Sequence, residues 1–520
     1  LARAIDDEAH GVLAKAARSY LDVLQQARTY DGPEAPLVAW FATSRLVRLR
    51  PSVSGLWTDA RPLVESAITE PGRIGFRARG DLVDWWAYEA RREAKTPRSV
   101  VDDQMADRLG CARVARFAGP FGRPAAIDVV RSFDAERPGA WPAVFERDPR
   151  RLEVASVVGT ERSACGLKAE KALGEGIHYV ETFLELEHAR DVIVVVHGAA
   201  NLRVDDVEVL HRDPRSFGVW PRFGVALHLG EGRHRIVARL GSPEAIVRVV
   251  DDAGRPVEGA RFSDDPSAPY ATTPPRILPD PNALSELMRH AGVPAQPCWP
   301  VTPSTYARVD ASYPLMRYLG AELSLVEGQG DLASVLAEPL VASPERATAL
   351  SLAAIASYVE EDPIFAGNDA RDLALDHRRR AVEKDPGLWY PALWIALDAA
   401  DKQGPKEALA ELGGLASRFT EVPAVSKALA SAYQRLGWRP ERNQTVLESA
   451  RRFPDDPEIL RALLTVHDEQ GQFTAADDVV ARLSALEPGA PLAAERALAR
   501  GDLAEAARLL EQHARDAGDP

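Results

Sequence analysis

The chain has 520 residues, of which 46% are hydrophobic and 27% charged, and its formal net charge is −14. This length excludes a single hydrophobic core and predicts about two to four domains. The acidic balance, with no long run of one sign, argues against general binding to nucleic acid or to an anionic membrane, since either needs a basic face. No apolar run approaches the roughly 18 residues that a membrane span needs.

Residues 1–108 have the periodicity of helices. The first thirty residues carry one apolar stripe, which Asp31-Gly32-Pro33 interrupts. Further helices are predicted within 36–50, 56–68 and 81–94. We expect these segments to form a helical layer of two irregular hairpins.

Residues 111–262 change to short runs in which β-branched residues alternate with polar ones. Turn residues separate the runs, among them Asp205-Asp206, Gly230-Glu231-Gly232 and the segment 251–254. This spacing predicts an antiparallel β-sandwich of jelly-roll type. The predicted strands lie within 112–119, 177–187, 191–198, 201–211, 222–229, 233–241 and 245–252.

Residues 263–305 are rich in proline, serine, aspartate and threonine, and they predict a linker ordered by its neighbours. Helical periodicity resumes over 306–520. There the prolines Pro423, Pro457 and Pro491 lie 34 residues apart. Four glycines recur in the same way, at spacings of 33, 34 and 30 residues: Gly404, Gly437, Gly471 and Gly501. Such a period is typical of stacked helical hairpins.

These hairpins resemble the tetratricopeptide repeat (TPR) family over about residues 340–515. Small residues stand where paired helices would cross, as at Ala430, Ala476 and Ala506, although Arg442 occupies one such position. The resemblance implies an α-solenoid that binds protein partners on its concave face. The non-core positions on the first helix of each hairpin would then contact an extended peptide or a partner helix. They are Trp394, Asp398, Lys427, Gln434, Arg435, Arg461, Thr465 and Asp468.

The β region has a resemblance of its own. The segments "VARFAGPFGR", "VIVVVHGAANLRVDDVEVLHRD" and "LHLGEGRHRIVARLG" resemble an opening strand, a strand-turn-strand and a penultimate hairpin of jelly-roll modules used for sugar binding. Such modules occur beside TPR arrays in exported bacterial proteins, some with a transglutaminase-like domain further on, which here would lie beyond Pro520. The aromatic rings that would stack on a bound sugar are those of Trp141, Phe217 and Trp220. The same aromatic residues could instead plug the core beneath loops.

Metal and catalytic sites are not expected. Cys111, Cys165 and Cys298 have no metal-binding spacing, so we expect at most one disulfide. Six of the eleven histidines lie in the β region, but no paired acids stand at ligand spacing. Cys165 could stand at the start of a short helix, where a thiol can act as a nucleophile. A small buried residue is the simpler interpretation. The chain contains no GxSxG, P-loop, GxGxxG or HExxH motif.

The sequence therefore predicts a multidomain α + β protein without cofactor or enzymatic activity. Its expected role is a scaffold in a bacterial assembly, in the periplasm or at the cell envelope. One alternative is a carbohydrate- or envelope-binding module acting through the sandwich. The other is the non-catalytic N-terminal part of a larger transglutaminase-like enzyme. The start at Leu1 and the end at Pro520 lead us to expect a trimmed chain.

Overall fold

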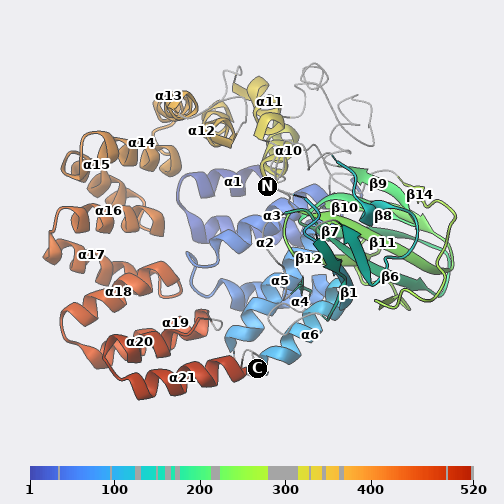
Figure 1. Ribbon diagram of the computed structural model, residues 1–520. Coiled ribbons are helices and arrows are strands. Elements are labelled where there is room, and N and C mark those ends of the chain that lie inside the picture. Colours follow the sequence, from blue (N-terminus) through green and yellow to red (C-terminus); the bar gives the residue numbers. More distant parts are fainter. Residues whose placement is uncertain are drawn as a thin grey trace.

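The computed structural model describes residues 1–32, 35–93, 96–122, 131–147, 150–158, 165–169, 176–211, 223–278, 314–326, 330–341, 347–361, 368–487 and 490–516. These residues form a helical N-terminal layer, an antiparallel β-sandwich and a run of TPR-like helical hairpins (Figure 1). This is the fold class predicted from the sequence. None of the described helices is both long and apolar enough to cross a lipid bilayer.

The N-terminal layer differs from its prediction at two places. The helix expected over the first thirty residues is divided at Gly11, where φ is 74°. A Cβ at Gly11 would lie 3.0 Å from both Phe419 and Val422, so glycine allows a close approach of the distant repeats. In addition, α6 lies outside the predicted helices. The layer comprises α1 (Ala2–Ala9), α2 (Leu13–Ala27), α3 (Ala35–Leu49), α4 (Leu56–Thr69), α5 (Gly75–Glu93) and α6 (Arg98–Leu109).

Two antiparallel sheets form the sandwich, and every predicted run contains a strand. One sheet has the order β4-β1-β6-β11-β8-β9, with β13 also paired to β6, and the other has the order β14-β10-β7-β12-β5. The strands are β1 (Val114–Ala118), β4 (Ala155–Val158), β5 (Leu167–Lys168), β6 (His178–Leu186), β7 (Arg190–His197), β8 (Ala199–Val204), β9 (Val207–His211), β10 (Phe223–Leu229), β11 (Gly232–Leu240), β12 (Glu244–Val250), β13 (Arg261–Ser263) and β14 (Arg276–Ile277).

The sandwich extends beyond its predicted boundary at residue 262. Strand β13 (Arg261–Ser263) crosses this boundary, and β14 lies within the segment expected to be a linker; they pair with β6 and β10 and so add to the two sheets. The predicted linker is thus partly a component of the sandwich. Its remainder, from residue 279 onward, lies outside the described residues.

Connections between strands confirm one predicted turn and correct another. Asp205 and Asp206 join β8 to β9, and both have positive φ, 49° and 66°, as a tight two-residue hairpin turn requires. The turn at Gly230-Glu231 was expected to close a hairpin as well. However, β10 pairs with β7 and β11 pairs with β6, so this turn carries the chain from one sheet to the other.

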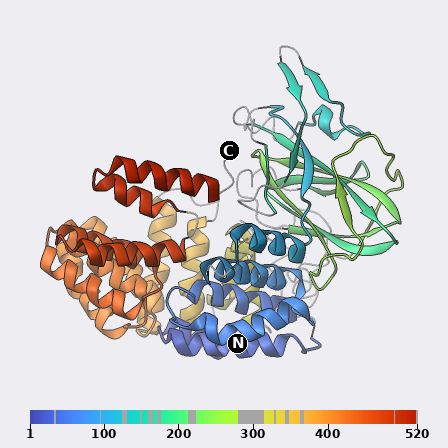
Figure 2. The ribbon, with the colours of Figure 1, turned by 90° about the horizontal axis from the view of Figure 1, so that it is seen from below.

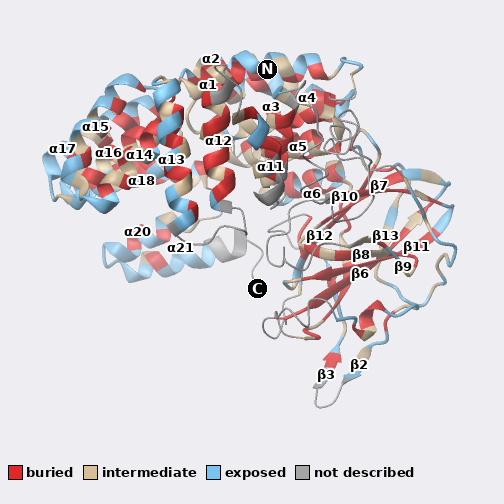
Figure 3. Cartoon of the chain, turned by 90° about the horizontal axis from the view of Figure 1, so that it is seen from above, coloured by how far each residue is buried: buried red, intermediate tan, exposed pale blue. Residues whose placement is uncertain are grey.

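A second cluster of aromatic residues covers the outer face of the sheet that contains β6. It includes Phe121, Phe133, Trp141, Phe145 and Tyr179. The covering segment contains the 3-10 helix η1 (Asp134–Glu136) and the hairpin of β2 (Val144–Arg147) and β3 (Arg150–Glu153), which extends from the sandwich in Figure 3. Both faces of this sheet are therefore buried, which explains why β6 contains buried residues at consecutive positions.

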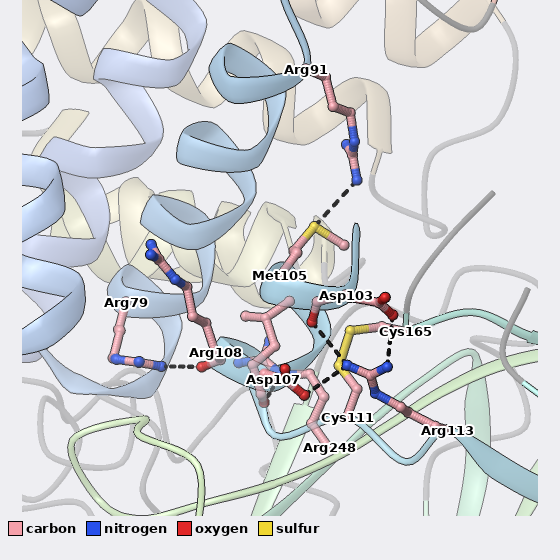
Figure 4. The surroundings of a disulfide bond; sticks show 11 residues. Arg79, Arg91, Asp103, Met105, Asp107, Arg108, Cys111, Arg113, Cys165 and Arg248 are labelled. Atoms are coloured by element: carbon pink, nitrogen blue, oxygen red, sulfur yellow. Dashed lines mark hydrogen bonds and ion pairs between the residues drawn. A yellow bond between two sulfur atoms is a disulfide. The ribbon is translucent and has the colours of Figure 1, made fainter. Parts of the chain in front are cut away.

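Covalent and polar contacts fix the sandwich to the N-terminal layer. Cys111, just after α6, forms a disulfide with Cys165, just before β5 (Figure 4). The Arg79 guanidinium on α5 donates to the carbonyl of Gly254 at 2.6 Å. In return, Arg248 on β12 donates to the carbonyl of Leu109 at 3.1 Å. The sandwich is thus docked on the helical layer through a disulfide and hydrogen bonds.

The C-terminal half is built from antiparallel helix pairs. Four successive hairpins are α14/α15, α16/α17, α18/α19 and α20/α21. Pro405, Pro423 and Pro457 are the first residues of their helices, where a missing N–H costs no hydrogen bond. The helices are α10 (Pro314–Val326), α11 (Gly330–Val341), α12 (Ala347–Glu361), α13 (Asn368–Lys384), α14 (Trp389–Lys402), α15 (Pro405–Arg418), α16 (Pro423–Arg435), α17 (Arg439–Arg452), α18 (Pro457–Glu469), α19 (Phe473–Leu486), α20 (Leu492–Ala499) and α21 (Leu503–Asp516).

The solenoid curves around the N-terminal layer and contacts it through the loops between hairpins (Figures 1 and 2). These contacts recur with the period of the repeats. Glu421 accepts from the backbone N–H of Ala14 at 3.1 Å, and Arg92 pairs with Asp455 at 3.5 Å. Further along the chain, the Tyr88 hydroxyl donates to the carbonyl of Leu486 at 3.0 Å. The layer therefore supports one edge of the solenoid and leaves the side chains of its first helices accessible elsewhere.

A buried polar cluster joins the layer to the start of the solenoid. Glu8 on α1 accepts hydrogen bonds from the Tyr20 hydroxyl at 2.7 Å and from the Arg45 guanidinium at 2.6 Å. Arg45 also lies 3.7 Å from Glu322 on α10, which accepts from the Tyr358 hydroxyl of α12 at 2.8 Å. Because each charge has a partner of opposite sign, the cluster fixes how these helices meet.

Candidate functional site

The concave face is here the surface formed by the first helices of the hairpins, α14, α16, α18 and α20. The sequence places its candidate partner-binding residues on these helices, and the structure does the same. Trp394 is 38% exposed on α14, and the Arg378 guanidinium of α13 lies 4.6 Å from its ring centroid. Such cation–π contact holds the indole in place. Gln434 on α16 and Thr465 on α18 are exposed.

Each of the five charged candidates forms an ion pair with a residue outside its own helix, and Asp398 also pairs with Lys402 on α14 itself. Arg435 on α16 lies 3.4 Å from Asp401 on α14, and Asp468 on α18 lies 2.6 Å from Arg496 on α20. The other pairs are Asp398 with Arg371 and Lys402, Lys427 with Asp456 and Glu458, and Arg461 with Glu487. A partner would meet a face whose charges are already balanced. Sequence reasoning missed this because pairing across repeats depends on their superhelical stacking.

A cavity of about 240 Å³ opens between α16 and α18, with α17 beneath it. Three predicted residues, Lys427, Gln434 and Thr465, line it. The remaining lining is partly apolar, from Ala430, Val446, Ile459 and Ala462, and partly polar, from Ser426, Ser431, Arg442, Ser449 and Glu458. The structure therefore brings three of the candidates together around one cavity and distributes the others along the solenoid.

Arg442 distinguishes this hairpin from the others. It is the fourth residue of α17, and the fourth residues of α15, α19 and α21 are the buried alanines Ala408, Ala476 and Ala506. The Arg442 guanidinium donates to the carboxylate of Glu469 at the end of α18, at 3.2 Å through Nη1. A long side chain at a helix crossing keeps the helices apart. The cavity thus coincides with the exception that the sequence shows at this position.

Charge pairing around the cavity shifts the pKa values of its ionisable groups. Burial by itself would lower the pKa of Lys427, but hydrogen bonds to Glu458 and Asp456 raise it above its usual value. The hydrogen bond from Lys427 in turn lowers the pKa of Glu458. In the same way, the hydrogen bond from Arg442 lowers the pKa of Glu469. The three pKa shifts favour the charged forms of Lys427, Glu458 and Glu469 at neutral pH.

The candidate sugar-binding residues do not form a described surface. Trp141 is 3% exposed, and its indole N–H donates to the carbonyl of Ala135 at 2.8 Å. Its ring packs edge-on against Phe145 in the outer cluster. Trp141 thus plugs the core beneath a loop. Phe217 and Trp220 lie outside the described residues.

The cysteines and the turn acids have structural partners. Because Cys165 is bonded to Cys111, it has no free thiol in this state. The side chains of the turn residues Asp205 and Asp206 contact His234, Arg235 and Tyr270. Within the described ranges, no three His, Cys, Asp or Glu side chains gather as metal ligands would. Cys298 lies outside those ranges.

The pairing of His234 with Asp205 gives a pH-dependent stability. His234 lies 2.7 Å from the carboxylate of Asp205 and 2.9 Å from the carbonyl of Gly230, so both ring nitrogens face acceptors. Although burial lowers it, these hydrogen bonds raise the pKa of His234. A histidine whose pKa is raised by folding stabilises the fold at pH values below its pKa in the unfolded chain, about 6.5. This contribution is lost as the pH rises through its pKa in the folded chain.

Between about pH 6 and pH 9, the native chain should therefore lose more unfolding free energy than His234→Gln does, because the glutamine does not titrate. Urea unfolding of both proteins at the two pH values measures this difference. An equal loss in the two proteins would contradict a protonated His234 in the fold.

Comparison with known proteins gives structural matches and no sequence matches. Neither a family model nor a curated protein matches the chain. Residues 41 to the end of MamA from Desulfovibrio magneticus RS-1 are 10% identical, with a TM-score of 0.28, over 34% of this chain and 97% of that one. The C-terminal part of a TPR repeat-containing protein from Cytophaga hutchinsonii is 13% identical, with a TM-score of 0.32, over 45% and 93%.

The human IFIT1 dimer with m7Gppp-AAAA is 13% identical, with a TM-score of 0.29, over 44% of this chain and 55% of that one. Identities and TM-scores this low carry no information on partners or ligands. The TPR-like character of α14–α21 follows from their own hairpins, their proline and glycine positions and their spacing near 34 residues.

Proposed function

We propose that the chain is a non-catalytic scaffold that binds a protein partner on the concave face of its solenoid. The observation that carries the proposal is the cavity between α16 and α18, which opens among the exposed residues of successive first helices. Stacked hairpins present such a face over several repeats, and partners bind it in extended form. Ion pairs between repeats and the support of the N-terminal layer keep the face rigid, so that binding costs little conformational entropy.

Affinity purification from the native cell, followed by mass spectrometry, tests this proposal. A tryptophan at Gln434 should block the face, and we expect Gln434→Trp to retain at least about tenfold less partner than the native chain, a loss of about 1.4 kcal/mol. Gln444→Trp is the matched control, because Gln444 is exposed on the second helix α17 and does not line the cavity. Equal retention by the two variants would contradict the proposal.

We also propose that the protein works in an oxidising compartment, such as the bacterial periplasm or the cell envelope. The disulfide between Cys111 and Cys165 supports this location, since disulfides rarely persist in a reducing cytosol. Differential alkylation of protein taken directly from the native cell should find both thiols protected until a reductant is added. Two freely alkylated thiols would contradict this location.

The two other functional classes have no described residue in their favour. Carbohydrate binding by the sandwich would depend on Phe217 and Trp220, because the ring of Trp141 is packed in the core. A glycan array with Trp220→Ala as the control decides that alternative. A role as part of a transglutaminase-like enzyme is decided by the sequence of the full gene.

A further inference from the structure

The cavity between α16 and α18 is suited to one kind of side chain, and this inference rests on the proposed function. Its apolar lining comes from Ala430 and Ala462 on the facing first helices and from Val446 and Ile459 deeper between them. Such a lining favours the burial of an apolar body. The cavity therefore offers an anchor point within an otherwise polar face.

The charges at the cavity argue against a charged ligand. Lys427 is paired with Asp456 and Glu458, and Arg442 with Glu469. An incoming carboxylate would have to displace one of the acids, and an incoming ammonium would have to displace one of the cations. Either exchange gives up a charge-assisted hydrogen bond that already exists. The balanced pairs thus favour an uncharged side chain.

Hydrogen-bonding groups surround the cavity at its polar side. The hydroxyl of Ser449 donates to the carbonyl of Thr445 at 2.7 Å, and that of Thr465 donates to the carbonyl of Arg461 at 3.1 Å. Each of these oxygens can still accept a hydrogen bond. The amide of Gln434 can both donate and accept. A ligand with a hydroxyl group would therefore find acceptors and a donor.

The volume of the cavity is sufficient for an aromatic ring. A closed apolar cavity of about 150 Å³ holds one benzene molecule. The cavity here is larger, about 240 Å³, and is open on one side. It has room for a six-membered ring with a polar substituent, and a tyrosine side chain joins an apolar ring to a hydroxyl.

We propose that this cavity binds a single tyrosine side chain of an extended partner segment. The ring lies between Ala430 and Ala462, and the phenol hydroxyl exchanges hydrogen bonds with the polar side of the cavity. Arg442 is a positioning residue, because its long side chain stands where the other three hairpins of α14–α21 have alanine and joins α17 to Glu469 on α18.

Ligand-observed NMR with the full chain and p-cresol, the tyrosine side-chain analogue, tests the proposal. We expect saturable binding of p-cresol that is at least fivefold tighter than that of 4-methylbenzoate or 4-methylbenzylammonium. These two probes have the same ring and carry opposite charges. Absence of saturable p-cresol binding, or tighter binding of either charged probe, overturns the proposal.

Variants locate the binding. Ala462→Leu fills the cavity and should weaken p-cresol binding at least tenfold. Ala410→Leu is the matched control, because Ala410 is exposed on α15 and does not line the cavity, and this variant should bind p-cresol as the native chain does. If Ala462→Leu fails to fold, Ser431→Leu takes its place, because Ser431 is exposed and also lines the cavity. Undiminished binding by the filled variant overturns the proposal.

The test separates this inference from the proposed function. If p-cresol binds at the cavity while Gln434→Trp retains every partner, the preference of the cavity for a phenol ring holds, but the function assigned to the concave face falls and with it the tyrosine of a partner. If partners are lost with Gln434→Trp while p-cresol does not bind, the function holds and the tyrosine assignment falls.

Discussion

Replacing Glu181 by glutamine is expected to lower the free energy of unfolding by about 3–5 kcal/mol, the usual cost of removing one partner from a buried ion pair. Glu181 on β6 is 0% exposed. Its two carboxylate oxygens lie 2.6 Å from the Arg116 guanidinium and 2.7 Å from that of Arg235. Both arginines are buried as well. The neutral amide would leave them beneath the covering segment without this carboxylate.

Glu146→Gln is the matched control, because Glu146 pairs with Arg151 on the exposed β2–β3 hairpin at 3.2 Å. An exposed pair contributes about 0.2–1 kcal/mol. Urea unfolding followed by circular dichroism measures both variants. A change in Glu181→Gln no larger than that in Glu146→Gln would show that the buried cluster does not stabilise the sandwich.

Loss of the disulfide is expected to cost about 4 kcal/mol, from the entropy of closing a loop of this length in the unfolded chain. The two cysteines are separated by 54 residues, and their bond joins the end of α6 to the sandwich. Thermal unfolding of the double variant Cys111→Ser, Cys165→Ser should therefore begin in the sandwich and its contact with the helical layer.

Dithiothreitol provides the control for that variant. The reductant should destabilise the native chain to the level of the double variant and should leave the double variant unchanged. A native chain that is insensitive to full reduction, confirmed by alkylation of both thiols, would mean that the bond does not stabilise the docked sandwich.

The sequence predicted correctly those strands, turns and helices that depend on residues close together in the chain. The seven strand runs depend on alternation, and the Asp205-Asp206 turn depends on residues that tolerate positive φ. The hairpins depend on helix-terminal prolines and on glycines such as Gly437 and Gly471, both with positive φ. In each case the residues that carry the signal are neighbours in the chain.

Features that depend on contacts between residues far apart in the chain could not be predicted from the sequence. The division of the first helix at Gly11 is explained by Phe419 and Val422, more than 400 residues away. The turn at Gly230 has the residues of a hairpin, and only the pairing of β10 and β11 with other strands shows that it crosses between sheets.

The candidate site was predicted only in part, because its ion pairs also depend on residues far apart in the chain. The repeat period places Gln434 and Thr465 on the concave face, but it does not show that Asp398, Lys427 and Arg461 pair with neighbouring helices. The one signal for the cavity in the sequence was Arg442, a large residue at a small-residue position. Its consequence depends on where Glu469 lies in the next hairpin.

Site-specific photo-crosslinking tests the central claim most directly. A benzophenone amino acid is placed at Thr465, which lines the cavity on the concave face, or at Gln444, which is exposed on α17 outside it. Illumination in the native cell should crosslink a protein partner to the chain that carries the probe at Thr465, and far less to the one with the probe at Gln444. Crosslinking at Gln444 alone, or none at Thr465 in the native cell, would contradict partner binding on the concave face.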